Sequence, residues 1–368
     1  MAARLPAADR SGQIPHRGNV AAMSVSVPFP RSQPPGYEWF DDEPTFDPST
    51  HLAIEEPDEI IMLEELGYRE DEIATKATAI AASSPFRVLS EEGAAIMLDI
   101  ARRLRPFANR AGDRVDRAVR GGCHRSRWFR DLCVSPQLTE AMAAIYGVDV
   151  APHAMPVHLG HLNFEPERLE TPVDRWHHDT LPLDNVMMVT DPATFAGGRF
   201  EWFRGTKHEM AEMAARGESP PRDRVEVPEF PAAGYAIALH GDMVVHRGAP
   251  LDAPGERITM VNGYVAMDRL VDEQSRNQDL IVVDDHTVLF PEWAKHVAWR
   301  AAGRLEHLLA ELPYGTSATE VRARLTEAIV DVQNAIDQMH PEREPAPTFH
   351  YEQAVPRPES GPQTGSTA

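Results

Sequence analysis

The chain has 368 residues, of which 42% are hydrophobic and 25% are charged, as in an ordinary globular protein long enough to bury a sizeable core. Its formal net charge of −21, from 36 basic and 57 acidic residues, would repel a phosphate backbone and so disfavours a nucleic-acid partner. No apolar run approaches the ~20 residues of a membrane span, and residues 1–10 lack a secretory signal. Cys123 and Cys133 are too few for a disulfide framework, so we expect a reduced, cytoplasmic protein.

Both ends of the chain have compositions that do not predict a packed core. Residues 1–50 are rich in Pro, Ser and Arg without sustained periodicity, which predicts a disordered N-terminal arm. Residues 341–368 are similar and predict a disordered tail. Between Asp41 and Glu72, 13 acidic residues stand against Arg69 alone, a local charge of 1 − 13 = −12. We interpret this segment as a solvated face.

The middle of the chain changes from a helical to a strand pattern. Residues 58–150 read as a helical flank, in which Met97, Ile100 and Leu104 follow the N-cap candidate Ser90 at helical spacing. From about 155 to 266, short apolar segments alternate with Gly and Pro turns, which favours an antiparallel sandwich or barrel. The predicted strands are Val157–Phe164, Val186–Thr190, Phe200–Phe203, Tyr235–Leu239, Met243–His246 and Ile258–Val265.

A second helical flank is predicted after Pro291, over residues 291–340. The segment Ser317-Ala-Thr-Glu320 is a capping-box sequence at the start of a helix with one apolar stripe, formed by Val321, Leu325, Ala328, Val332 and Ile336. Such a stripe could bind a partner, but more often it packs on its own domain, and we expect that here. The pattern predicts an α+β fold with a single domain over 51–340, its β core over 155–266. The sequence carries no signal of oligomeric state.

The segment Arg175-Trp-His-His-Asp-Thr180 is the first candidate for chemistry. Side chains alternate between the faces of an extended strand, so His177 and Asp179 share one face and His178 points away. An imidazole and a carboxylate on one face can reach the same metal ion, with a third ligand from elsewhere in the chain.

A His-x-acid triplet has little weight by itself, because chance gives about 2.5 of them in a chain of this composition. The sequence contains four, beginning at residues 177, 240, 340 and 350, and the last two lie in or beside the predicted tail. His240 and Asp242 form a serious rival pair because they lie in the β region. Only the first triplet is followed by a separate histidine with an arginine eleven residues later, His246 and Arg257.

This order of residues resembles the iron(II)- and 2-oxoglutarate-dependent oxygenases, nearest to their phytanoyl- and prolyl-hydroxylase-like branches. Two histidines and a carboxylate form the facial triad of non-haem iron(II) oxygenases. The resemblance covers about Val157 to Val265 and includes the Gly-Gly turn in Ala196-Gly-Gly-Arg-Phe200. It implies a double-stranded β-helix, a jelly-roll or cupin-like core, flanked by N- and C-terminal helices.

The resemblance also implies a site. His177, Asp179 and His246 would hold Fe(II), and Arg257 would bind the distal carboxylate of 2-oxoglutarate, assisted by Thr259 on the same face. O₂ would be the second cosubstrate, with succinate and CO₂ released. Hydroxylation of a small molecule, an amino acid or a biosynthetic intermediate, is the expected outcome. Desaturation, ring closure and epimerisation are alternatives, whereas halogenases lack the carboxylate that Asp179 provides.

Other readings remain open at this point. A cupin-like metal enzyme could use the same ligands without 2-oxoglutarate, and a non-catalytic β-sandwich could bind a ligand without metal. A lone histidine is more often structural, which applies to His158, His161 and His178, and Arg257 could be an ordinary ion-pair partner. Four further residues are candidates for the substrate pocket: His161, Asn163, Arg199 and Trp202.

Overall fold

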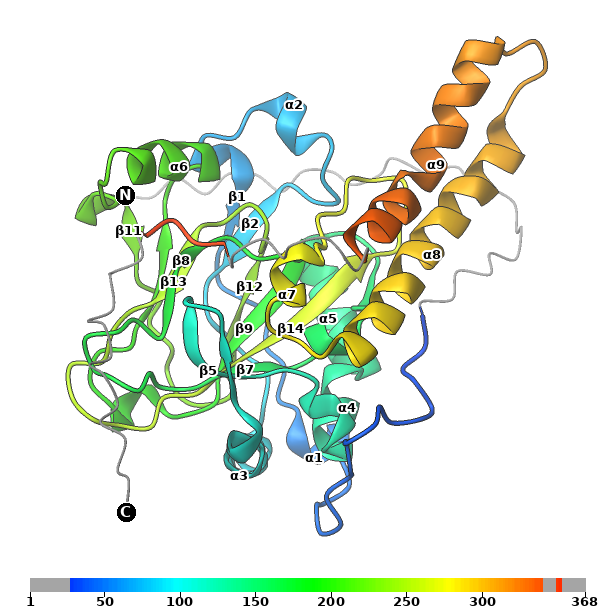
Figure 1. Ribbon diagram of the computed structural model, residues 1–368. Coiled ribbons are helices and arrows are strands. Elements are labelled where there is room, and N and C mark those ends of the chain that lie inside the picture. Colours follow the sequence, from blue (N-terminus) through cyan, green and yellow to red (C-terminus); the bar gives the residue numbers. More distant parts are fainter. Residues whose placement is uncertain (1–26, 340–348, 353–368) are drawn as a thin grey trace, which may run out of the picture.

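The computed structural model describes residues 27–339 and 349–352, which form two antiparallel β-sheets flanked by helices (Figure 1). The larger sheet contains β1 Ile60–Met62, β2 Ile80–Ser83, β3 Phe86–Arg87, β4 Asn109–Ala111, β5 Val115–Val119, β6 Val150–Pro152, β7 His161–Asn163, β9 Leu183–Met188, β12 Tyr235–Leu239 and β14 Thr259–Ala266. The smaller sheet contains β8 Asp174–His177, β10 Phe200–Phe203, β11 Val225–Glu226 and β13 His246–Gly248. The α-helices are α1 Pro48–His51, α2 Glu70–Ile73, α3 Glu91–Leu104, α4 Arg127–Cys133, α5 Pro136–Tyr146, α6 Lys207–Ala215, α7 Gln278–Ile281, α8 His286–Glu311 and α9 Ala318–Gln338.

From β7 onward the chain alternates between the two sheets. Strands β7, β9, β12 and β14 belong to the larger sheet, whereas β8, β10, β11 and β13 belong to the smaller one, and their pairings are antiparallel. Side chains from both sheets line one cavity between them. This is the topology of a double-stranded β-helix, so the predicted fold class is confirmed. Strands β1 to β5 extend the larger sheet before the alternation begins.

Helices α3, α4 and α5 cover the outer face of the larger sheet. Ser90 caps α3 by accepting a hydrogen bond from the backbone N–H of Gly93 at 3.0 Å, and Met97 and Leu104 are fully buried. On β14 the residue Met260 packs against these helices, while Thr259 and Val261 face the cavity. Burying each large apolar side chain contributes roughly 1.5–3 kcal/mol, so this helical layer fixes the sheet and leaves its inner face for the site.

Several boundaries differ from the sequence prediction. The stretch 58–150 contains five strands as well as helices, because β1 to β5 are two to five residues long and too short to show a period. Strand β7 covers only the end of the predicted Val157–Phe164 segment, and β13 begins where the predicted Met243–His246 strand ends. Helix α8 begins before Pro291, at His286, where Asp285 caps it by accepting a hydrogen bond from Thr287.

The terminal segments differ too. Residues 27–50 are not a free arm, since Phe40 and Phe46 pack on the core and Glu43 accepts hydrogen bonds from Ser126 and from the backbone of Arg127. In the predicted tail, the backbone N–H of Tyr351 donates to the carbonyl of Trp176 on β8 at 2.7 Å. Residues 1–26, 340–348 and 353–368 lie outside the described residues. Of the 13 carboxylates between 41 and 72, eleven are exposed, as a solvated face requires.

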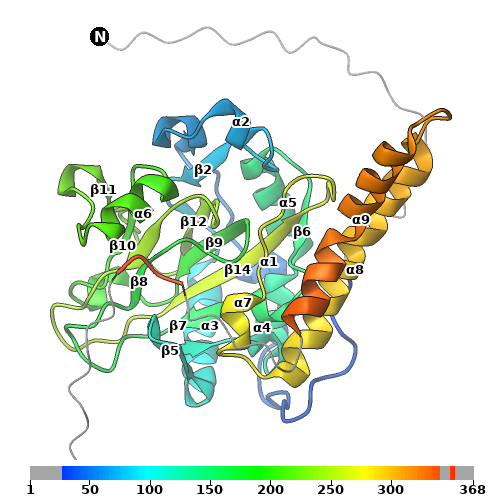
Figure 2. The same ribbon diagram turned by 45° about the horizontal axis from the view of Figure 1, so that its top comes forward.

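Helices α8 and α9 form an antiparallel hairpin that projects beyond the sheets (Figures 1 and 2). The N-terminal half of α8 packs against the rest of the protein through Leu289, Trp293 and Val297. Its C-terminal end lies far from the sheets (Figure 1). None of the described helices is long and apolar enough to cross a membrane.

Candidate active site

The structure brings His177, Asp179 and His246 together. Strands β8 and β13 are neighbours, and His177 lies directly opposite His246, with ring centroids 4.2 Å apart. The Nε2 atoms of His177 and His246 lie 3.3 and 3.4 Å from the two carboxylate oxygens of Asp179. The backbone N–H of Asp179 donates to the carbonyl of Gly241 at 2.8 Å. A Cβ on Gly241 would come within 2.9 Å of the Asp179 Cβ, so this approach requires glycine.

Backbone carbonyls orient both imidazoles. The Nδ1 atom of His177 donates to the carbonyl of Arg175 at 2.6 Å, and that of His246 donates to the carbonyl of Val244 at 3.0 Å. A carbonyl only accepts hydrogen bonds, so each contact places a ring proton on Nδ1. The Nε2 atoms face Asp179 and are the ring nitrogens available to a metal, as in metal sites whose outer hydrogen bonds fix the tautomer.

The charge states of these groups also suit a cation. Burial and the neighbouring His177 together lower the pKa of His246 to about 4, so the His246 ring is neutral at pH 7. Burial alone would raise the pKa of Asp179, but His246 and His177 hold it below its usual range. A neutral imidazole and an ionised carboxylate are the forms that bind metal.

Arg257 lies in the same cavity, just before β14. Its Nε donates to the carbonyl of Gly198 at 2.9 Å, and its guanidinium donates to the Thr259 hydroxyl at 2.9 Å. The Gly-Gly turn makes the first contact possible, because Gly197 and Gly198 adopt φ values of 75° and 59°. The predicted turn therefore holds the predicted arginine.

The Arg257 guanidinium is a buried cation that forms no ion pair within the described part of the chain, although the more distant Asp174 raises its pKa against the effect of burial. The residue is 1% exposed, and burial lowers the pKa of Arg257 to about 10. Among the described residues, no carboxylate forms an ion pair with its side chain. A buried unpaired charge costs several kcal/mol, which an anionic ligand bound in the cavity would offset.

The cavity that holds these groups is small, with a volume of about 30 Å³. Of the four predicted pocket residues, His161 and Asn163 line it. The other two predictions are corrected. Arg199 is exposed to solvent before β10, and Trp202, although opposite His246 in the sheet, packs with Ile61 and Leu63 in an apolar cluster.

Sequence reasoning missed several lining residues. Asp174, three residues before His177 on β8, forms an ion pair with Arg114 at 3.0 Å and accepts a 3.4 Å hydrogen bond from Asn163. The sequence did contain a signal for Asp174, because an acidic residue between the apolar Val173 and Trp176 is expected to be buried. A buried carboxylate needs a polar or charged partner, which would have indicated a polar site here. Arg114 lies in the turn between β4 and β5 and belongs to no motif.

A second, small cavity of about 20 Å³ adjoins the first. Both are lined by Asp179, His161 and two further residues, Arg114 and Val261. Arg120, His158, Thr180 and Leu280 line the second cavity only.

The second cavity offers polar groups to a ligand. The buried Nε2 atoms of His158 and His161 have no hydrogen-bond partner within the described residues. Burial and the nearby Arg120 lower the pKa of His158 to about 3, so its ring is neutral. Arg120 donates to Asp284 at 2.8 Å, which leaves its remaining N–H groups for other contacts.

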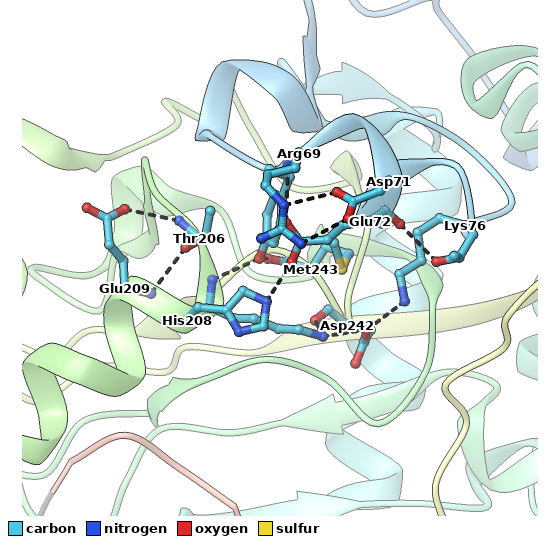
Figure 3. Close-up of polar contacts among 12 residues, drawn as sticks. Arg69, Asp71, Glu72, Lys76, Thr206, His208, Glu209, Asp242 and Met243 are labelled. Carbon is cyan, nitrogen blue, oxygen red and sulfur yellow. Dashed lines mark hydrogen bonds and ion pairs between the residues drawn. The ribbon is translucent and has the colours of Figure 1, made fainter.

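The rival pair His240 and Asp242 is structural. Asp242 is 1% exposed, and Lys207 donates to it at 2.8 Å, with Arg276 at 3.6 Å and Lys76 at 3.9 Å. Figure 3 shows Asp242 beside Lys76 in a network that joins the loop after β12 to α2 and α6. Three cationic side chains already surround this carboxylate and neutralise its charge, so it would bind a metal ion weakly.

The remaining histidines of the triplets lie elsewhere. His178 points away from the cavity, as alternation predicts, and shares a 2.8 Å hydrogen bond with the Tyr351 hydroxyl. His350 contacts Asp113 at 3.0 Å, and His340 lies outside the described residues.

A second group of two histidines and a carboxylate, His153, Glu273 and His296, has its ligand atoms within 4.8 Å of one another, as the first group has. Here the backbone N–H of Met155 donates to His153 Nδ1 at 3.1 Å, so the ring proton is on Nε2 and donates to Ser275 at 2.7 Å. Ser275 and His296 both donate to Glu273. Hydrogen bonds thus engage Glu273 and both ring nitrogens of His153, whereas Nδ1 of His296 has no partner among the described residues.

No protein-family model and no curated protein sequence matches this chain. Solved structures resemble it distantly. The epimerase SnoN from nogalamycin biosynthesis, a non-heme alpha-ketoglutarate-dependent enzyme, is 18% identical over 55% of this chain and 82% of SnoN, with a TM-score of 0.35. The non-heme monooxygenase ThoJ, in its nickel complex, is 16% identical over 70% of this chain and 96% of ThoJ, with a TM-score of 0.38. EctD from S. alaskensis, solved with 2-oxoglutarate and 5-hydroxyectoine, is 16% identical over 61% of this chain and 82% of EctD, with a TM-score of 0.36.

Proposed function

We propose that this chain is an iron(II)- and 2-oxoglutarate-dependent oxygenase that oxidises a small molecule. The observation that supports it most is the sharing of one cavity by two complementary features. One is the His177–Asp179–His246 group with its free Nε2 lone pairs, and the other is the buried, unpaired guanidinium of Arg257.

The donor set suits iron(II). Two imidazole nitrogens and one carboxylate from neighbouring strands are the facial ligand set of non-haem iron sites, and they leave coordination positions for other ligands. Zinc would accept the same atoms, but a zinc site with three protein ligands gives no role to a buried arginine in the same cavity. The arginine therefore favours iron with an anionic cosubstrate.

The environment of Arg257 suits a dicarboxylate. A guanidinium can bind a carboxylate through two parallel hydrogen bonds, and Thr259 adds a hydroxyl beside it. This argues against a cupin-like enzyme without 2-oxoglutarate, in which the buried cation would have no partner. It argues equally against a binding module without metal, which would not need the three converging ligands.

Each residue then has a distinct task. Bound Fe(II) and 2-oxoglutarate would supply an oxidant from O₂, with release of succinate and CO₂. His177, Asp179 and His246 would hold the metal, while Arg257 and Thr259 would orient the cosubstrate. The walls contributed by both sheets restrict the access of water to these groups.

The second cavity is the proposed place of the substrate, because it reaches Asp179 without including Arg257. Arg120 and the unpartnered Nε2 atoms of His158 and His161 suit a compact substrate with several hydrogen-bonding groups. An amino acid or a biosynthetic intermediate with such groups fits this description. Hydroxylation is the proposed outcome, because a single oxidised C–H bond is the simplest use of the oxidant.

An anaerobic titration tests this proposal without knowledge of the substrate. 2-Oxoglutarate is added to the Fe(II)-loaded protein, and the visible metal-to-ligand charge-transfer absorption of the chelate is recorded. The band should appear in the natural protein and fail to appear in His177→Ala. Iron binding without the band would instead support the cupin-like enzyme, and an absence of iron binding would support the binding module.

A further inference from the structure

The α8–α9 hairpin carries an unusual share of the exposed apolar surface. Fourteen large hydrophobic residues are exposed in the part of the chain that the structure describes, and eight of them lie between 305 and 336. Leu309 is 88% exposed. The eight residues are Leu305, Leu309, Leu312, Tyr314, Leu325, Ile329, Val330 and Ile336.

Six of these residues form a continuous stripe. The buried Ala328 and Ala335 mark the centre of the α9 face that packs against the protein. At 100° of rotation per residue, the exposed Leu325, Ile329 and Ile336 all lie on the same side of that centre. On α8, Leu305 and Leu309 lie on the corresponding flank beside the buried Ala301, and Leu312 follows directly after the helix as its C-cap. On both helices the exposed residues are rotated in the same direction from the buried alanines. Because the two helices are antiparallel, this rotation places both sets of exposed residues on the same side of the hairpin.

The opposite side of the hairpin is polar. Arg304 contacts Asp331 at 3.2 Å and donates to the carbonyl of Glu327 at 3.0 Å, and Arg324 donates to Glu320 at 2.7 Å. The hairpin is therefore apolar on one side only. The expectation that the stripe of α9 packs on its own domain is wrong for Leu325 and Ile336, because small alanines make the contact with α8 instead.

We propose that this apolar face binds the same face of a second copy of the chain, forming a two-fold symmetric dimer. Two antiparallel stripes on one hairpin are self-complementary under a two-fold axis, and two such hairpins give a four-helix arrangement. The hairpin projects from the sheets (Figure 2), so two copies can approach there without contact between their sheets.

The exposed area matches the requirement of a stable dimer. The exposed fractions of the six stripe residues add up to about three fully exposed side chains, on the order of 500 Å². A standard interface buries about 800 Å² per partner, of which roughly 55–65% is apolar. The stripe supplies that apolar share, and neighbouring polar side chains can supply the rest.

Charge does not oppose the contact at this location. The whole chain has a net charge of −21, but residues 300–339 contain four basic and six acidic residues, a local charge of 4 − 6 = −2. Repulsion between two hairpins is therefore weak, which favours the hairpin over the acidic N-terminal face as a self-association surface.

Sedimentation velocity of the full chain between 1 and 200 µM tests the proposal. The natural protein should sediment as a dimer, and Leu309→Glu should raise the dissociation constant more than about a hundredfold by placing a charge in the apolar contact. Leu169→Glu and Val227→Glu are matched controls, because these residues are 38% and 37% exposed elsewhere on the surface. Both controls should remain dimeric.

A monomeric natural protein over the whole range would overturn the proposal, as would a dimer that Leu309→Glu leaves intact. Circular dichroism should show the same helix content in all variants, because each mutated side chain is exposed. The milder Ile329→Ala should weaken the dimer without introducing a charge. Iron binding should be unchanged throughout, which separates this proposal from the proposed function.

Discussion

Two buried groups in this protein have the same composition, two histidines and one carboxylate, with ligand atoms equally close. In the His177–Asp179–His246 group, backbone carbonyls accept from Nδ1 and leave Nε2 unprotonated. In the second group, a backbone N–H donates to His153 Nδ1, so its Nε2 carries the proton. The atom that would bind a metal is a lone pair in one group and a hydrogen-bond donor in the other. Composition and distance thus do not define a metal site unless the backbone partners of the imidazoles are also known.

The second group has a structural role that follows from its contacts. His296 on α8 donates to Glu273 at 2.8 Å, and its ring stacks on His153 with centroids 5.0 Å apart. His153 in turn contacts His158, which lines the second cavity, with ring centroids 4.6 Å apart. This network joins the base of α8 to the loop before α7 and to the wall of the proposed substrate chamber.

The sharpest test of the comparison is iron stoichiometry. We expect one iron per natural chain, measured by elemental analysis after anaerobic loading and desalting. His177→Ala and His246→Ala should each lose more than about a hundredfold in iron affinity, exceeding the effect of removing an outer hydrogen-bond partner. His153→Ala should retain one iron per chain. A natural chain with two irons, reduced to one by His153→Ala, would contradict the tautomer argument.

Arg257→Ala should separate the metal from the cosubstrate. We expect full iron occupancy but a dissociation constant for 2-oxoglutarate about 10- to 100-fold higher, since a charge-assisted contact contributes about 1.5–3 kcal/mol. Arg257→Lys should restore part of the affinity, because lysine supplies the charge without the two parallel donors. Calorimetry of the iron-loaded, anaerobic protein measures this. An unchanged affinity in Arg257→Ala would assign the cosubstrate to another partner.

The sequence was informative where chemistry and backbone period coincide. Strands Phe200–Phe203 and Tyr235–Leu239 match their predicted bounds, because each is an apolar run between turns. His177 and Asp179 could be paired by alternation, and His246 and Arg257 by their spacing. The alternation of side chains along a strand could not predict the surroundings of Arg199 and Trp202. It does not distinguish an inward side chain that lines a cavity from one that packs in the core.

Other parts of the molecule had no local signal. Strand β3 has two residues, and its conformation depends on pairing with β12, more than 140 residues later in the chain. Arg114 reaches the site only because β4 and β5 extend the larger sheet. His296 and Glu273 are 23 residues apart, and they meet through the docking of α8. Such contacts arise from tertiary packing, which a short motif does not record.

Glu273→Gln should weaken the fold without affecting iron. Burial alone would raise the pKa of Glu273, but His296 holds it well below its usual range, so the carboxylate is ionised at pH 7. Its loss should reduce the free energy of unfolding by about 2 kcal/mol, because one partner of a buried charged contact is removed. Iron stoichiometry should stay at one per chain.

The pH dependence of that loss has a defined sign. A depressed carboxyl pKa stabilises the fold above the unfolded pKa of about 4.3, and the contribution is lost as the pH falls toward the folded pKa. The stability difference between the natural protein and Glu273→Gln should thus be constant from pH 6 to 8 and shrink below about pH 4. Urea unfolding at each pH measures it. A difference that grows on acidification would show that His296, rather than Glu273, dominates the contact.

Tyr351→Phe should have the smallest effect and tests the two faces of β8. It removes the 2.8 Å hydrogen bond to His178, which follows His177 in sequence but points away from the cavity, and a long 3.4 Å hydrogen bond to the carbonyl of Lys207. Their loss should cost about 1 kcal/mol of unfolding free energy, mostly from the shorter contact. Iron affinity should not change, because no ligand of the first group contacts this hydroxyl. A clear fall in iron affinity would mean that the outer face of β8 transmits strain to His177, and the separation of the two faces would then be incomplete.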